Sequence, residues 1–149
     1  MALQSVGASG WEARPLQSKA SLSVATGTLS ATQALDIATQ AATAVEDREG
    51  WLRPGDRSAN KLSFTVRDMV REGNEPVLSF DVEVDRAVGR VTVRTVITSY
   101  VMKSSGMNAL VPVPKRKIAG FNAYRTFMET YARMLQAADR GANVSFSGD

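Results

Sequence analysis

Few side chains in this 149-residue sequence could carry out chemistry, because it contains neither cysteine nor histidine. Their absence removes disulfides, thiol nucleophiles, imidazole general bases and zinc sites built from Cys and His. Catalysis would therefore depend on carboxylates, Lys, Tyr or Ser. The one acid that stands out of place is Asp68. The sequence thus favours a non-catalytic protein and predicts no catalytic residue, metal site or cofactor.

Asp68 falls on the apolar row of a predicted strand, between Val66 and Val70. An isolated carboxylate in an apolar environment is costly, which makes Asp68 a candidate polar anchor for a ligand. A β-bulge at Asp68–Met69 would instead turn Asp68 outward and Met69 inward. Such bulges are common in long antiparallel strands, so the sequence favours the bulge.

Aromatic and methionine side chains recur before Gly141 at spacings of three and four, the spacing of one helical face. We expect this stripe to cover a sheet, where it is more often core than ligand site. A hollow interior would instead bind an apolar small molecule. Trp51, flanked by turn residues, would be a lid over one end of the core or the rim of a pocket. The candidate ligand-binding residues are Asp68, Phe64, Phe80, Tyr124, Phe127, Met128, Tyr131 and Trp51.

A second candidate site is a basic segment, residues 103–117, which contains no acid. Its candidate anion-binding residues are Lys103, Lys115, Arg116 and Lys117. They could meet phosphate or an acidic partner. They have no interleaved aromatic residues and no glycine-rich cradle, so the default interpretation is a solvated loop. Nucleic acid is therefore the weakest of the partner hypotheses.

The elements that position these residues centre on residues 61–102. Apolar and polar residues alternate there in three runs, which predicts three consecutive antiparallel strands with one buried face. Turns are predicted at residues 72–76, which contain Gly, Asn and Pro, and near residues 87–89, which end in Gly89.

The register of the second hairpin follows from its turn. If Ala87–Val88 is a two-residue loop, Asp81 faces Arg94 on the outer face. Pairing across the previous turn would place Arg67 beside Asp81. We interpret this ladder of Arg67, Asp81 and Arg94 as a solvated surface with register-setting ion pairs, rather than as a binding surface.

Further elements flank this meander. Alternation over residues 19–26 predicts a strand. Ser30 and Gln33 fit a capping box, so a helix is expected from there to about Asp47. Residues 48–60 are expected to form a polar loop, because Gly50, Pro54 and Gly55 lie within them. The last helix should begin at Gly120 or Asn122 and end at Gly141.

The predicted fold class is therefore α+β, in the order β-α-β-β-β-α. An antiparallel sheet of about four strands would have both helices packed on one face. The expected division is a flexible N-terminal arm at residues 1–18, a single α+β domain at 19–141, and a short polar tail at 142–149.

Composition sets the remaining limits. Hydrophobic residues make up 44% and charged residues 22%, both normal for a globular protein, and the formal net charge is +3. No apolar run is long enough to cross a membrane, and the N-terminus does not have the pattern of a secretory signal. Since cysteine is also absent, we expect a cytoplasmic protein without membrane insertion.

The element order resembles the helix-grip arrangement of START-like lipid- and polyketide-binding domains, with a long C-terminal helix across a curved sheet. That resemblance implies an apolar ligand between sheet and helix. The helix–three strands–helix core is also similar in order to double-stranded-RNA-binding domains. The first hypothesis is nevertheless a non-catalytic interaction or assembly domain with a homo-oligomeric or other protein partner. The alternatives are a carrier of an apolar small molecule and nucleic-acid binding through the basic loop.

Overall fold

The computed structural model describes residues 16–47, 50–67, 76–101 and 118–148. It confirms the α+β class and the antiparallel sheet. The elements in chain order are η1 (Leu16–Lys19), β1 (Ser21–Thr26), α2 (Ala31–Ala44), β2 (Glu46–Asp47), β3 (Gly50–Arg57), β4 (Lys61–Arg67), β5 (Pro76–Ala87), β6 (Arg90–Tyr100), α3 (Phe121–Ala138) and β7 (Asn143–Ser147).

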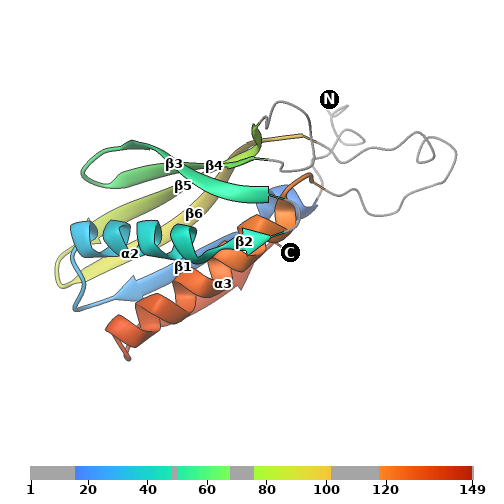
Figure 1. Ribbon diagram of the computed structural model, residues 1–149. Coiled ribbons are helices and arrows are strands. Elements are labelled where there is room, and N and C mark those ends of the chain that lie inside the picture. Colours follow the sequence, from blue (N-terminus) through green and yellow to red (C-terminus); the bar gives the residue numbers. More distant parts are fainter. Residues whose placement is uncertain (1–15, 48–49, 68–75, 102–117, 149) are drawn as a thin grey trace, which may run out of the picture.

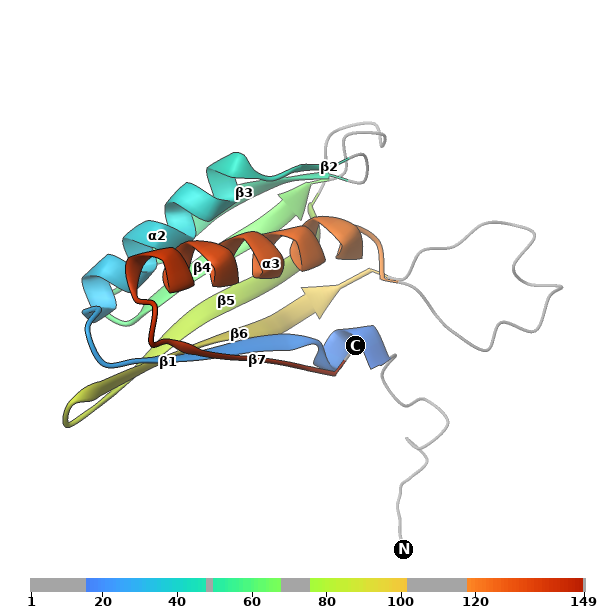
Figure 2. The same ribbon diagram turned by 90° about the horizontal axis from the view of Figure 1, so that it is seen from below.

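The sheet has more strands than expected. In the described part of the chain it contains seven, in the order β2-β3-β4-β5-β6-β1-β7, and each neighbouring pair is antiparallel. The prediction of about four strands was therefore wrong. Both helices lie on the same face of the curved sheet, and β7 lies at the opposite margin from β3 (Figures 1 and 2).

Two segments that were expected to be irregular form strands. Residues 50–57, expected within a polar loop, are β3, and residues 143–147, expected within a polar tail, are β7. Pro54 is tolerated because β2 pairs only with Trp51 and Gly50, so β3 is an edge strand at Pro54. The register against β4 also shifts between Pro54 and Arg57, which accommodates the proline and Gly55.

The register predicted for the β5–β6 hairpin was wrong by two residues. The two residues between the strands are Val88 and Gly89, and Gly89 has a φ of 72°. A tight two-residue hairpin turn requires positive φ, which glycine adopts without strain. Arg94 is consequently opposite Glu83, and its Nη2 lies 3.3 Å from the Glu83 Oε1.

The predicted ladder of Arg67, Asp81 and Arg94 is likewise not formed. Arg67 lies opposite Pro76, beyond a register shift that begins after Val66. Asp81 instead accepts a 2.8 Å hydrogen bond from the Ser63 hydroxyl, and its Oδ2 lies 3.9 Å from Lys61 Nζ. Such part-exposed pairs stabilise a fold only weakly.

Helix α2 begins as its capping box predicts. The Ser30 hydroxyl accepts from the Gln33 backbone N–H at 3.1 Å, and the Gln33 side chain accepts from the Ser30 N–H at 2.8 Å. The helix ends at Ala44, because Val45 is already extended. Its buried face consists mainly of small residues, which lets the helix lie close to the sheet and to α3: Ala31, Ala34, Leu35, Ala38, Ala41 and Ala42.

Helix α3 begins at a glycine that no other residue could replace without strain. Gly120 is the N-cap with a φ of 78°, and a Cβ there would lie 2.9 Å from Val66 Cγ1 and 3.0 Å from Val77 Cγ2. The chain must pass this close to β4 and β5 to lay α3 across the sheet. The helix ends at Ala138 with Asp139 as its C-cap, and not at Gly141 as expected.

Candidate functional site

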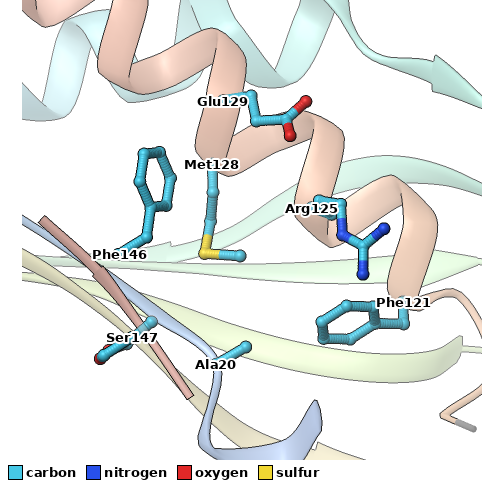
Figure 3. A pocket seen from close by; sticks show the side chains of 8 residues that line it. Ala20, Phe121, Arg125, Met128, Glu129, Phe146 and Ser147 are labelled. Carbon is cyan, nitrogen blue, oxygen red and sulfur yellow. The ribbon is translucent and has the colours of Figure 1, made fainter. Parts of the chain in front are cut away.

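A groove lies between α3 and the margin of the sheet formed by β1 and β7 (Figure 3). Its volume is about 150 Å³. The groove is lined from three elements and the residue before β1: Ala20, Ser21, Phe121, Arg125, Met128, Glu129, Phe146 and Ser147.

Helical and strand periodicity bring these residues together. Phe121, Arg125 and Met128 recur at spacings of four and three, so they lie along one stripe of α3. On the sheet side, Phe146 is opposite Leu22 and therefore belongs to the inner, apolar row of β7. β7 is the last strand of the sheet, so Phe146 has a neighbour on one side only and remains 51% exposed.

The groove has an apolar floor and a polar rim. Phe121 and Met128 are almost fully buried at its base. Arg125 places its Cζ 5.3 Å from the centre of the Phe121 ring, and Glu129 is exposed beside it. The Ser21 and Ser147 hydroxyls, 2.9 Å apart, belong to the outer row of β1 and β7, on the face away from α3. This arrangement suits an apolar side chain better than it suits proton transfer, since the lining offers one carboxylate and no nucleophile with a base.

β7 also offers backbone groups. In the described chain it pairs with β1 alone, so about half of its N–H and C=O groups face away from the sheet. Residues 143–147 contain no charge and no proline, and their register against β1 is regular. Natural proteins usually protect such an edge with charge, proline or a bulge.

The opposite edge is protected in that way. β3 contains Arg53, Pro54, Gly55 and Arg57, all exposed, together with its register shift. Arg57 Nη2 also lies 2.9 Å from the Asp36 carboxylate of α2. The two edges of the sheet therefore differ in kind: the β3 edge resists pairing and the β7 edge permits it.

A buried network of hydrogen bonds holds β1 in place, and β7 pairs with β1. The Leu22 N–H donates to Thr95 Oγ1 at 2.9 Å, and the Tyr124 hydroxyl donates to the Ala20 carbonyl at 2.7 Å. Since the single Tyr124 proton is used there, the 2.8 Å contact between Thr95 and Tyr124 has Thr95 as donor. Burial raises the pKa of Tyr124 to about 12, and its hydrogen bond with Thr95 lowers the pKa in part.

A second hydroxyl joins the two helices. Tyr131 donates to the Ala34 carbonyl of α2 at 2.7 Å, and burial raises the pKa of Tyr131 well above its ordinary value.

At the C-terminal end of α3, the Thr26 hydroxyl donates to the Asp139 carboxylate. The Gly141 N–H donates to the same carboxylate at 3.0 Å. These hydrogen bonds, that of Thr26 first, hold the pKa of Asp139 below its usual range.

Most of the predicted ligand-binding aromatics pack against one another. The Phe80 ring centre lies 5.3 Å from Phe64, 4.7 Å from Tyr124 and 5.0 Å from Phe127. Phe127 also lies 5.3 Å from Tyr131. All five side chains have 0% exposure. Their rings therefore occupy the space between the sheet and α3 themselves.

The remaining predicted residues are dispersed. Met128 lines the groove. Trp51 is half-buried in β3, where the Arg53 guanidinium lies 4.7 Å from its ring centre. Asp68 and the four basic residues Lys103, Lys115, Arg116 and Lys117 lie outside the described residues.

Sequence reasoning missed the strand side of the groove. Phe146 and Ser147 were placed in a polar tail, and Arg125 was not considered as a lining residue. A signal was present, because residues 143–147 alternate polar and apolar, which is the pattern of a half-buried strand.

Among the described residues, no group of three or more acidic side chains could hold a metal ion, and no helix there is long and apolar enough to span a membrane. No protein-family model matches the chain, and no curated protein matches it significantly.

Proposed function

We propose that this chain is a non-catalytic interaction domain that takes up an extended segment of a protein partner at the β7 edge of its sheet. The contrast between the two sheet edges carries the proposal. Proline, charge and a register shift protect β3, whereas β7 has none of these and presents the half-exposed Phe146. Addition of a strand to an open edge is a recurrent mode of peptide recognition, in which main-chain hydrogen bonds supply affinity and side-chain pockets supply specificity.

The groove supports the same function. A strand added beside β7 would place its inner-row side chains next to Phe146, on the face covered by α3. An apolar side chain there would remove part of Phe146 from water, while Arg125 and Glu129 at the rim would remain solvated. The lining therefore favours a partner segment that alternates apolar and polar residues.

A carrier of an apolar small molecule has less support. Five aromatic rings fill the interior in which such a ligand was expected. The groove, at about 150 Å³, is smaller than the roughly 300–1,000 Å³ of typical ligand pockets. The hypothesis of nucleic-acid binding rests on basic residues outside the described part of the chain, so no contact described above supports it.

Replacement of Phe146 tests the proposal. We expect Phe146→Lys to lower retention of the partner at least tenfold in quantitative affinity capture from the source cells. Val88→Lys is the matched control, because Val88 is fully exposed at the β5–β6 turn, far along the chain from β7. Circular dichroism should show that both variants fold. Equal loss in both variants, or full retention by Phe146→Lys, would contradict the proposal.

A further inference from the structure

We propose that the segment taken up at this edge is β7 of a second copy of the chain, paired antiparallel about a two-fold axis at Ser145. The inference rests on the proposed function and names its partner. β7 is symmetrical about its centre, because Val144 and Phe146 flank Ser145, and Asn143 and Ser147 flank those two. Read from either end, the strand is polar, apolar, polar, apolar, polar.

This symmetry makes the strand complementary to itself. In an antiparallel pair centred on Ser145, Val144 of one copy faces Phe146 of the other, and the same contact occurs twice. Apolar cross-strand pairs of this kind stabilise a sheet. Asn143 would face Ser147, and Ser145 would face its own copy, so no like charges are opposed. A shift of one residue would place Val144 and Phe146 opposite polar residues.

The geometry of the pairing keeps the apolar surfaces together. A two-fold axis that relates two antiparallel edge strands is perpendicular to their sheet. The helices of both copies would therefore lie on the same face, with the two grooves on either side of the junction. Phe146, now 51% exposed, would gain a neighbour where it faces solvent. Two seven-stranded sheets would continue as one.

The same edges limit the assembly to a dimer. The contact uses β7 of both copies, so in the described part of the chain the margins left at the ends of the joined sheet are those formed by β2 and β3. Pro54 and the exposed arginines of β3 oppose further pairing. An isologous contact of this type closes on itself and does not propagate into a fibre. Because the paired strands are only five residues long, the interface is small, and we expect a dissociation constant in the micromolar range.

Charge substitution at the two-fold axis tests this arrangement. In Ser145→Lys, and separately in Ser145→Glu, the new side chain would face its own copy and repel it. We expect each variant to dimerise at least tenfold more weakly than the wild type in sedimentation velocity across the micromolar range. An equimolar mixture of the two should restore the dimer. Ala59→Lys adds the same charge at the exposed β3–β4 turn and should leave dimerisation unchanged.

The outcomes separate this inference from the function on which it rests. A dimer that neither Ser145 variant weakens would show that the copies meet elsewhere and would overturn the inference. A monomer at every concentration would also overturn it. In that case the proposed function would stand if capture from cells still found a partner sensitive to Phe146→Lys, and it would fall if capture did not.

Discussion

Tyr124→Phe should destabilise the fold more than the same change at Tyr131, although both hydroxyls are buried and both donate to a backbone carbonyl at 2.7 Å. The difference lies in what each deletion leaves behind. When the Tyr124 hydroxyl is removed, the Ala20 carbonyl loses its donor and the Thr95 hydroxyl loses its acceptor. A buried polar group left without a partner costs about 1–3 kcal/mol.

Tyr131→Phe leaves the Ala34 carbonyl with another hydrogen-bond donor. Ala34 lies within α2, so its carbonyl still accepts the helical hydrogen bond from the Ala38 N–H. Only the net value of one hydrogen bond is lost, about 0.5–1.5 kcal/mol. We therefore expect the free energy of unfolding of Tyr124→Phe to lie about 1 kcal/mol below that of Tyr131→Phe.

Urea unfolding followed by circular dichroism measures both variants under the same conditions. A double-mutant cycle with Thr95→Val then tests the proposed chain of donors, because residues that share a hydrogen bond should couple by about 0.5 kcal/mol or more. If Tyr131→Phe proves as costly as Tyr124→Phe, or if Tyr124 and Thr95 act additively, the assignment of Thr95 as donor to Tyr124 is wrong.

The remaining predictions concern a backbone position and a carboxylate. Gly120→Ala should lower the free energy of unfolding by about 2 kcal/mol or more, since it combines left-handed strain with a clash against Val66. Gly89→Ala, at a similar φ but in open space, should cost only about 1 kcal/mol in the same urea titration, and equal costs would contradict the clash. Asp139→Asn should lower the thermal midpoint at neutral pH. In the folded protein the hydrogen bond from Thr26 is the main cause of the lowered pKa of Asp139. A lowered pKa stabilises the fold at pH values above the unfolded pKa of about 3.9, and this stabilisation is lost as the pH falls through the pKa of the folded protein. The gap between Asp139→Asn and wild type should therefore shrink in acid, and a gap independent of pH would refute the prediction.

Strong local signals were enough to predict the two helices. The capping box at Ser30 and Gln33 fixed the start of α2, because it satisfies backbone donors within one helical turn. The stripe from Phe121 to Leu135 identified the buried face of α3, since each apolar position recurs at helical spacing. Both signals depend on residues close in sequence, so no knowledge of the tertiary fold was needed.

The sheet edges and the candidate site depend on distant contacts, and there prediction from the sequence failed. Pro54 and Gly55 indicate a loop unless it is known that β3 lies at an edge, where a missing N–H is tolerated. The alternation over residues 143–147 is only five residues long, and what makes it a strand of this sheet is its pairing with β1, more than 100 positions earlier in the sequence. The groove joins Met128 to Phe146, and only the strand order brings those two residues together.

The position of β1 between β6 and β7 affects the order in which the sheet can form during synthesis. The Ser21 and Ser147 side chains that meet across β1 and β7 are 126 positions apart in sequence. Pairings this distant are slow to form, because a long loop must close before they can stabilise the chain. During synthesis from the N-terminus, β1 emerges before both of its neighbours, so it can pair with β6 and then with β7 only after each of them has been made. Until β7 emerges, β1 is the open margin of the nascent sheet, so a ribosome stalled between α3 and β7 would leave Leu22 and Val24 without the strand that borders them.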